Sequence, residues 1–282
     1  MYRSLLFTPG HKIEYIKDLK FFPDILVIDL EDSVSKDKKN LAFKKTESFL
    51  NRSDYKKSKI YIRINFNNKF IDKKYHNLIK DSLDGIILPK VKNKKELIIL
   101  LNFVKKYEKL KKIKKKIKIS FIAETTQSII NLNEIIKSTN RIEFIIYGEE
   151  DYHSELNNIN FAENLKNNYA KNIIPILAKA NHIQAIFTPY LYLNNSSGLK
   201  KHILESIMFG YSGLLLIHPK QISLANKLYM PSIKDIKIAN QIMNSNKSKK
   251  YEGQNISVLK NKLIGPPMIK RAEKILNLYK KK

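Results

Sequence analysis

The chain has 282 residues and contains no cysteine, which excludes disulfide scaffolds, thiolate metal sites and cysteine nucleophiles. Acidic residues are also scarce, because 26 Asp and Glu stand against 53 Lys and Arg, for a formal net charge of +27. No apolar run reaches the roughly 18 residues that a membrane span needs. The longest apolar run, residues 22–30, is interrupted by one proline and two aspartates. These absences argue against a membrane-spanning protein and against a fold held together by disulfides.

Apolar residues make up 43% of the chain, which is enough to build a core and excludes a chain that stays disordered for lack of burial. The length allows one large α/β domain or two small ones. The first residues, MYRSLLFTPGHK, have too short an apolar stretch for a signal peptide. We therefore expect a cytoplasmic enzyme or binding protein.

The basic charge first suggests a nucleic-acid partner. Only five of the basic residues are arginine, however, and arginine is the side chain best suited to bidentate phosphate and guanine contacts. The lysines are spread along the whole chain, which indicates a compositional drift more than a binding patch. A non-catalytic, nucleic-acid-binding barrel therefore remains an alternative that rests on charge alone.

Short β-rich apolar runs alternate with stretches of helical periodicity. The predicted strands are residues 4–8, 25–30, 60–65, 85–89, 117–123, 142–147, 183–188 and 213–217. Their continuous Ile, Leu and Val content is typical of parallel strands that are buried on both faces. Eight such units in about 220 residues predict a (β/α)8 TIM barrel. An open doubly wound sheet is the runner-up, but it would call for a glycine-rich turn that TPGHK does not match.

The chain continues beyond the eighth strand. We expect a barrel over residues 1–220 and a C-terminal helical extension over residues 221–282, whose last helix begins at the Pro266-Pro267 pair. The polar stretch 245–253 is the segment expected to be most mobile. The extension would pack on the barrel or on a neighbouring subunit.

Polar or charged side chains follow nearly every predicted strand. Because the carboxyl ends of barrel strands meet at one rim, where catalytic residues gather, these side chains form one candidate set. In chain order they are Asp29, Glu31, Asp32, Arg63, Asn65, Lys90, Glu124, Glu149, Glu150, Asp151, Thr188 and His218. Carboxylates dominate this rim although the chain as a whole is short of acid.

Glu124 and Asp151 follow consecutive strands and are therefore the candidate ligands of one Mg2+ ion. Hard divalent cations prefer a few carboxylate oxygens and keep several waters. The structural alternatives are an ion pair with a lysine for Glu124 and a helix N-cap for Asp151.

Arg63 lies inside the strand pattern YIRIN, where a buried guanidinium needs an anion. A substrate carboxylate or an enolate would supply it, and an internal ion pair with Glu31 or Asp29 is the alternative. Lys90 could bind the same anionic groups through its charge, or it could form a Schiff base. His218 is as compatible with a packed strand-end histidine as with a catalytic one.

Eight segments carry a resemblance to a known family. They are RSLLFTPGH (3–11), DILVIDLEDSV (24–34), YIRIN (61–65), DGIILPKV (84–91), IAETTQSIINLNEI (122–135), YGEEDYHSEL (147–156), GYSGLLLIHPKQI (210–222) and PPMIKRAEKIL (266–276). In this order they resemble the β-subunit family of citrate lyase, within the HpcH/HpaI aldolase and CoA-ester lyase superfamily. The resemblance covers almost the whole chain.

The resemblance implies a barrel that binds Mg2+ through Glu124 and Asp151, with Arg63 on the keto-acid or carboxylate portion of the substrate. Asp29, Glu31, Asp32 and Lys90 match motif positions that line the same pocket. It further implies cleavage or formation of a carbon–carbon bond beta to a thioester, as in citryl-CoA, malyl-CoA or citramalyl-CoA. A homotrimer or homohexamer is implied, in which the C-terminal segment of one subunit covers a neighbour's site.

Three features depart from the family pattern. Phe187 stands where the family has an acid at the seventh strand, and Gly265 stands near the place of an acid before the final helix. The glycine usual in the glutamate motif is also absent, with Gln127-Ser128 in that region. A CoA-independent aldolase acting on a free 2-keto acid therefore remains a second enzyme hypothesis.

Overall fold

The computed structural model describes residues 1–52, 55, 57–67, 70–157, 169–247, 257–259 and 262–280. The chain divides into two compact units, Met1–Asn226 and Lys227–Lys282. Most of the polar stretch 245–253, which was expected to be mobile, lies outside the described residues.

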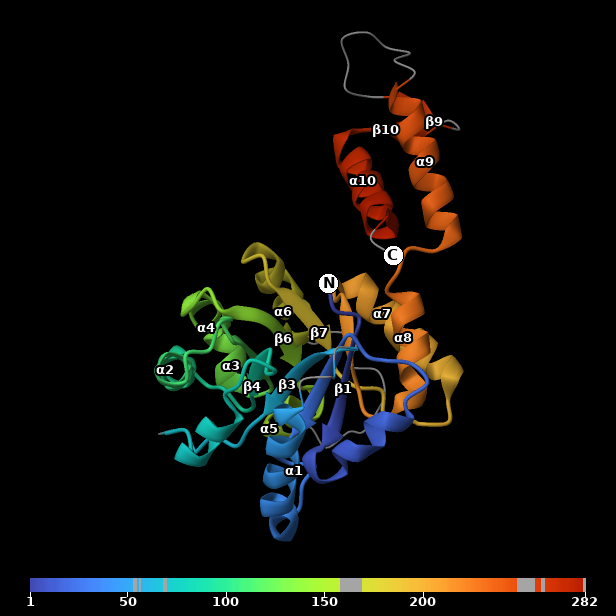
Figure 1. Ribbon diagram of the computed structural model, residues 1–282. Helices are drawn as coiled ribbons and strands as arrows, with labels where there is room; N and C mark the ends of the chain where they lie inside the picture. The colour runs from blue at the N-terminus through green and yellow to red at the C-terminus, as the bar shows by residue number, and fades with distance from the viewer. Residues whose placement is uncertain are drawn as a thin grey trace. The chain divides into compact units, whose positions relative to one another are not determined.

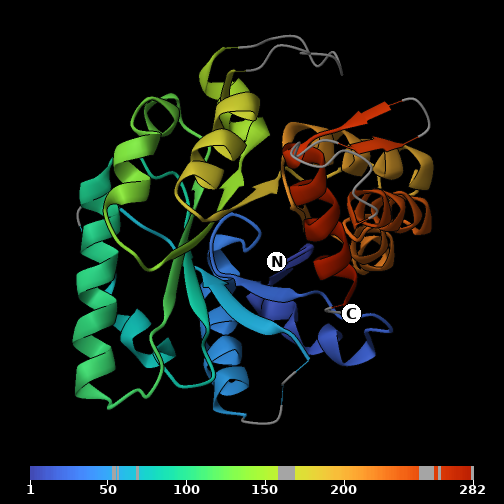
Figure 2. The same ribbon diagram turned by 90° about the horizontal axis from the view of Figure 1, so that it is seen from above.

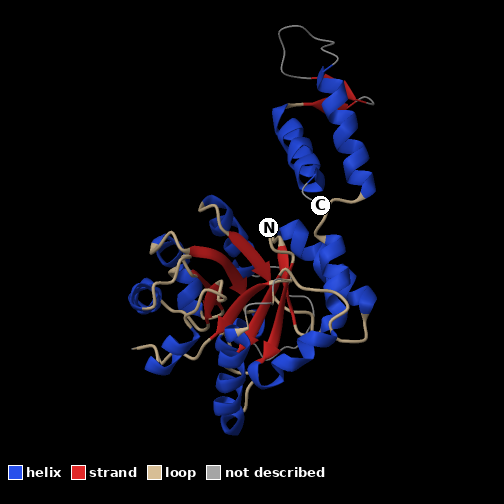
Figure 3. Ribbon diagram, viewed as in Figure 1, coloured by secondary structure: helices blue, strands red, loops and turns tan. Residues whose placement is uncertain are grey.

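The first unit is a closed barrel of parallel strands, which confirms the predicted (β/α)8 TIM fold (Figures 1 and 3). The strands pair in chain order, and the last pairs with the first. Each begins and ends within two residues of its prediction, and they are β1 Ser4–Pro9, β2 Ile25–Asp29, β3 Lys59–Arg63, β4 Gly85–Leu88, β5 Lys118–Ala123, β6 Ile142–Tyr147, β7 Gln184–Phe187 and β8 Gly213–Leu216.

Helices connect the strands on the outside of the barrel (Figure 2). They are α1 Lys39–Asn51, preceded by the 3-10 turn η2 Lys36–Lys38, then α2 Lys94–Leu110, α3 Thr126–Ile130, α4 Leu132–Lys137, α5 Glu149–Glu155, α6 Tyr169–Ala180, α7 Ser196–Phe209 and α8 Ile222–Leu228, with η4 Pro219–Gln221 before the last. After β1 and β3 the connections are the 3-10 segments η1 Gly10–Asp18 and η3 Lys73–Leu78 instead of α-helices. Between β5 and β6 the helical connection is divided at Asn131 into α3 and α4.

The barrel is filled by apolar side chains from its strands. A buried core cluster joins Leu5, Ile25, Val27, Tyr61, Ile87, Ile122, Phe144, Ile146, Ile186 and Leu215. β2 and β4 are buried along their whole length, as their unbroken apolar sequences predict for parallel strands covered on both faces. This packed interior holds the carboxyl ends of the strands at fixed positions.

Tyr61 fills the barrel toward the amino-terminal ends of the strands. A Cβ at Gly85 would lie 2.1 Å from the Tyr61 ring, so only glycine leaves room for that side chain. The hydroxyl of Tyr61 donates a hydrogen bond to Glu143, and Tyr2 donates to the other oxygen of the same carboxylate at 2.9 Å. Tyr2, Tyr61 and Glu143 therefore form a polar layer at this end of the barrel.

The second unit contains α9 Ile233–Lys247, α10 Pro266–Lys280 and a hairpin of β9 Ser257–Leu259 and β10 Lys262–Ile264. Ala239 and Ile242 of α9 pack with Ile264 and Ala272. The two helices were expected from their periodicity, whereas the three-residue strands carry too short a pattern to be predicted. In the described part of the chain, no helix has both the length and the apolar character that a membrane span requires.

Candidate active site

Asp29 and Arg63 form the centre of a charged cluster at the carboxyl ends of β2 and β3. The guanidinium donates from Nε to Asp29 Oδ1 at 2.7 Å and from Nη2 to Oδ2 at 2.5 Å. Its Nη1 lies 3.2 Å from Glu31 Oε2. Asp29 is fully buried, and the Arg63 side chain is 14% exposed. The internal ion pair expected as the alternative is therefore present, with one side of the cluster still open to solvent.

Opposing effects set the ionisation of these groups. Burial raises the pKa of Asp29, but the hydrogen bonds and charge of Arg63 outweigh it and hold that pKa below its ordinary value. Burial also raises the pKa of Glu31, and there the attraction of Arg63 does not fully compensate. Arg63 itself is kept cationic, because Asp29 and Glu31 raise its pKa against the effect of burial. Asp29 thus stays an anion that orients the guanidinium, and Glu31 is the better proton acceptor.

Lys90 joins this cluster from the loop after β4. Its Nζ donates to Glu31 Oε1 at 3.1 Å and to Asp32 Oδ2 at 2.8 Å. Burial lowers the pKa of Lys90, but these two carboxylates outweigh it and raise the pKa overall. A Schiff-base lysine needs a depressed pKa. The geometry therefore favours the electrostatic role considered for Lys90 over the covalent one.

Glu124 follows β5 and is 4% exposed. Its Oε1 accepts a hydrogen bond from the main-chain N–H of Lys90 at 2.6 Å. A Cβ at Gly148 would lie 2.4 Å from Glu124 Cβ, so the close approach of the β6 end requires glycine. Burial and then the nearby charge of Asp151 raise the pKa of Glu124 to about 8. The ion pair with a lysine that was considered for Glu124 is absent from the described residues, where its lysine contact is a main-chain one.

Asp151 lies in the first turn of α5 and is exposed. The N-cap of this helix is Gly148, so the capping role considered for Asp151 is wrong. Within the described ranges no group of three His, Asp or Glu residues could hold a metal ion. The arrangement is instead a pair, one buried carboxylate and one exposed carboxylate, and Mg2+ is commonly held by one or two carboxylates plus water and substrate.

The other rim residues have different surroundings. His218 caps η4, since its Nδ1 accepts from the N–H of Lys220 at 3.1 Å. Glu149 is half-buried, and burial is the largest cause that raises its pKa, with smaller effects of the charges of Lys171, Glu150 and Glu205. Phe187 is fully buried with its ring centroid 4.7 Å from that of Tyr211. The acid usual at this strand is thus replaced by an aromatic contact.

Phe7 is a site residue that the sequence did not single out. The guanidinium carbon of Arg63 lies 5.2 Å from the centroid of its ring, a cation–π distance. Its place in the first matching segment was the available signal, and β2 separates its strand, β1, from the strand of Arg63, β3. The ring limits the side chain positions that Arg63 can adopt.

The chain matches the model of the HpcH/HpaI aldolase/citrate lyase family over residues 3–219. It therefore belongs to this family, and it is an enzyme of the carbon–carbon lyase class. Citrate lyase subunit beta of Leuconostoc mesenteroides subsp. cremoris is 27% identical over 281 residues, covering 98% of this chain and 92% of that protein. Human mitochondrial citramalyl-CoA lyase is 24% identical over 288 residues, covering 98% and 85%.

Solved structures share the fold. A citrate lyase from Burkholderia xenovorans LB400 superposes with a TM-score of 0.85 at 14% identity, covering 99% of this chain and 92% of that one. The protein CitE from Mycobacterium tuberculosis, in complex with magnesium, acetoacetate and coenzyme A, gives a TM-score of 0.77 at 18% identity, covering 98% and 97%.

Proposed function

We propose that this protein is a Mg2+-dependent lyase that cleaves a hydroxyacyl-CoA reversibly between its α and β carbons, by an aldol-type reaction through an enolate. The observation that carries the proposal is the cluster of Arg63, Lys90 and Glu31 beside the Glu124 carboxylate at one rim of the barrel. Cations and carboxylates at this spacing suit a reaction that moves one proton and builds negative charge on an oxygen.

Glu124 and Asp151 are the residues proposed to hold the metal. Two carboxylates close enough for one to raise the pKa of the other are an environment that a divalent cation would relieve. When bound, Mg2+ would polarise the hydroxyl and carboxylate oxygens of the substrate. Asp151 is exposed, so a metal ion held between it and Glu124 would be accessible to a substrate.

Arg63 and Lys90 are proposed to bind the anionic groups. Arg63 has planar N–H donors suited to a carboxylate, and Asp29 fixes its orientation. The Lys90 ammonium, 45% exposed at the side chain, is able to turn from Glu31 and Asp32 toward a developing enolate oxygen. Both cations remain charged throughout the neutral pH range.

Glu31 is the proposed base, because burial raises its pKa while Arg63 and Lys90 bracket it. It would accept the proton of the substrate hydroxyl. The electron pair of the broken O–H bond then forms the C=O bond of the keto acid or aldehyde. The bond between the α and β carbons breaks, and its electron pair passes to the thioester carbonyl as an enolate. Protonation of the enolate carbon completes the reaction.

The relatives support the thioester part of this proposal. One relative is a citramalyl-CoA lyase, and the CitE structure contains coenzyme A and acetoacetate with magnesium. The net charge of +27 also favours binding of the phosphates of CoA.

We further propose a homotrimer or homohexamer in which the second unit, Lys227–Lys282, acts as a lid on a neighbouring subunit. The exact assembly stays a prediction, testable by light scattering.

A thermal-shift screen tests the function. Malyl-CoA, citryl-CoA, citramalyl-CoA, oxaloacetate and pyruvate are each added with Mg2+ or with EDTA. We expect stabilisation by thioester or keto acid only in the presence of Mg2+. Stabilisation by keto acids but by no thioester would favour the CoA-independent aldolase. Metal-independent shifts with nucleic acid that vanish steeply with salt would contradict the proposal and favour the basic binding module.

A further inference from the structure

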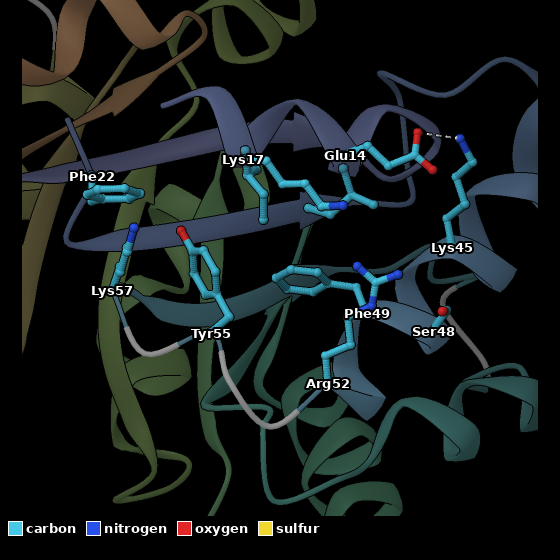
Figure 4. A pocket seen from close by; sticks show the side chains of 11 residues that line it. Glu14, Lys17, Phe22, Lys45, Ser48, Phe49, Arg52, Tyr55 and Lys57 are labelled. Atoms are coloured by element: carbon cyan, nitrogen blue, oxygen red, sulfur yellow. Dashed lines mark hydrogen bonds and ion pairs between the residues drawn. The ribbon is translucent and has the colours of Figure 1, made fainter. Parts of the chain in front are cut away.

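A cavity of about 350 Å3 lies on the outside of the barrel, between η1 and α1 (Figure 4). Its lining comes from three segments of the first unit, namely η1 with Phe22, the second half of α1, and the residues before β3. The lining residues are Ile13, Glu14, Ile16, Lys17, Phe22, Lys45, Ser48, Phe49, Arg52, Tyr55 and Lys57. A volume of this size falls in the range of small-molecule sites.

The cavity is separate from the candidate active site. Phe22 precedes the start of β2, and Tyr55 and Lys57 precede the start of β3. The cavity therefore reaches toward the amino-terminal ends of these strands, whereas Asp29 and Arg63 stand at their carboxyl ends. None of its lining residues belongs to the charged cluster described above.

The floor of the cavity is apolar and largely aromatic. Ile13 and Ile16 of η1 are 3% and 5% exposed, and Phe49 of α1 is 9% exposed. The ring of Tyr55 lies against that of Phe49 with centroids 5.4 Å apart. These two rings offer an aromatic surface on which an apolar ring of a ligand can pack.

The rim carries an excess of positive charge. Lys17, Lys45, Arg52 and Lys57 line the cavity, and Glu14 is the sole acid among the lining residues. Glu14 is already engaged, because its carboxylate lies 3.0 Å from Lys45 Nζ. The ammonium of Lys57 lies 4.2 Å from the centre of the Phe22 ring, so a cation stands directly over an aromatic wall.

Arg52 is the rim residue most suited to an anionic group. Arg3, Arg63 and Arg141 each form an ion pair with a carboxylate. Arg52 is exposed, and within the described ranges no acidic side chain lies at ion-pair distance from it. An arginine beside aromatic rings recognises a planar anion by combining hydrogen bonds with stacking.

We propose that this cavity is a second binding site, for a small amphipathic anion with a flat body of one or two rings and a carboxylate or similar head group. The body would lie on Phe49 and Tyr55, and the head group would meet Arg52 and a neighbouring lysine. The proposal is independent of the reaction at the carboxyl ends of the strands, since none of the residues of the candidate active site lines this cavity.

Titration with 2-naphthoate, followed by calorimetry and by ligand-observed NMR, tests this site. The neutral isostere 2-naphthamide has the same shape without the charge. We expect its affinity to be lower than that of 2-naphthoate by about tenfold or more. Arg52→Gln should lower the affinity for 2-naphthoate by roughly tenfold or more, which is the loss expected for one charged hydrogen bond. Ser48→Trp, at an exposed lining position, should abolish binding by filling the cavity.

Two control variants locate the ligand. Arg271→Gln removes an arginine from the second unit and should bind as the parent does, which excludes an effect of net charge. Arg63→Lys should also retain parent affinity, because the rim of the barrel is not the proposed site. Loss of binding in Arg63→Lys would overturn the proposal. So would equal affinity for the amide, or parent-like binding by both Arg52→Gln and Ser48→Trp with circular dichroism unchanged.

Discussion

The main-chain N–H of Lys90 donates to Glu124 Oε1 at 2.6 Å, and Lys90 makes this bond from a left-handed backbone conformation with φ of 53°. The same residue places its Nζ on Glu31 and Asp32. Lys90 alone thus connects the candidate metal ligand Glu124, which follows β5, with the acidic residues Glu31 and Asp32, which follow β2. The strained backbone is the conformation that aims the N–H at Glu124.

Replacement of Lys90 by glycine and by alanine separates these two roles. Both variants lose the ammonium, so both should lose turnover. Glycine adopts a positive φ without the clash of a Cβ, and Lys90→Gly should therefore be more stable to urea than Lys90→Ala by about 1 kcal/mol. Equal unfolding free energies for the two variants would show that the backbone at this position is not strained.

Arg63→Lys tests bidentate recognition of a substrate carboxylate. Lysine keeps the charge but offers no planar fork, so the affinity for a keto acid should fall on the order of 1.5–3 kcal/mol, a loss of one or two decades. Calorimetric titration with oxaloacetate in the presence of Mg2+ measures it. Arg141→Lys is a matched control, because that buried arginine pairs with Glu108 away from the rim. Unchanged affinity in Arg63→Lys would leave only the structural ion pair with Asp29.

The raised pKa of Glu124 predicts a pH dependence of stability in the metal-free protein. Its carboxyl has a pKa of about 8 in the folded chain, against an ordinary value of 4.5. Between these values the folded protein holds the extra proton, so the free energy of unfolding falls as pH rises, by up to about 1.4 kcal/mol per pH unit. Above pH 8 the penalty is complete.

Glu124→Gln should flatten that decline, and urea titrations from pH 5 to pH 9 in EDTA measure it. Glu134→Gln, at an exposed pair with Lys94, should keep the slope of the parent. Identical slopes in the parent and in Glu124→Gln would show that Glu124 titrates normally. Mg2+ must also displace this proton, so its affinity should improve as pH rises toward 8.

Gly265 predicts weak turnover of the standard thioesters. The acid expected near this position from the family resemblance is absent, and glycine has no group that can protonate an enolate carbon. Proton-transfer groups contribute about 10²–10⁴-fold to rate, so cleavage of malyl-CoA and citryl-CoA should be slow by that factor, while keto-acid binding persists. Glu149, Glu150 and His218 were candidate replacements from the sequence, but His218 caps η4 and Glu149 lies beside Lys171 and Glu205.

Gly265→Asp should raise the lyase rate. Among the described residues, a Cβ at this position would meet only Pro267 Cδ, at 3.8 Å, which is an ordinary van der Waals distance. Acyl-CoA release, followed by chromatography, compares the variant with the parent. Rapid cleavage of either thioester by the parent would refute the prediction.

The barrel could be predicted from the sequence because unbroken apolar strands and their spacing are direct consequences of burial on both faces. The connections could not all be predicted. η1 and η3 are 3-10 segments where the (β/α)8 pattern calls for α-helices, and β9 and β10 are too short to show an alternating pattern.

The candidate site was predictable as a set of residues, because strand ends share one rim. What each side chain contacts was not. The pairing of Arg63 with both Asp29 and Glu31, and the left-handed backbone at Lys90, depend on distances set by the barrel. The charge of Asp151 raises the pKa of Glu124, so the two side chains lie near each other, but the exposure of Asp151 depends on the position of α5 and could not be predicted from the sequence.

The central claim is that Glu124 and Asp151 hold one Mg2+ that the substrate requires. Calorimetric titration of oxaloacetate into the parent, Glu124→Gln, Asp151→Asn and the surface control Glu134→Gln, each with Mg2+ or EDTA, tests it most directly. The account predicts Mg2+-dependent binding in the parent and the control, and none in the two site variants, with circular dichroism unchanged. Parent-like binding of oxaloacetate by both Glu124→Gln and Asp151→Asn would contradict it.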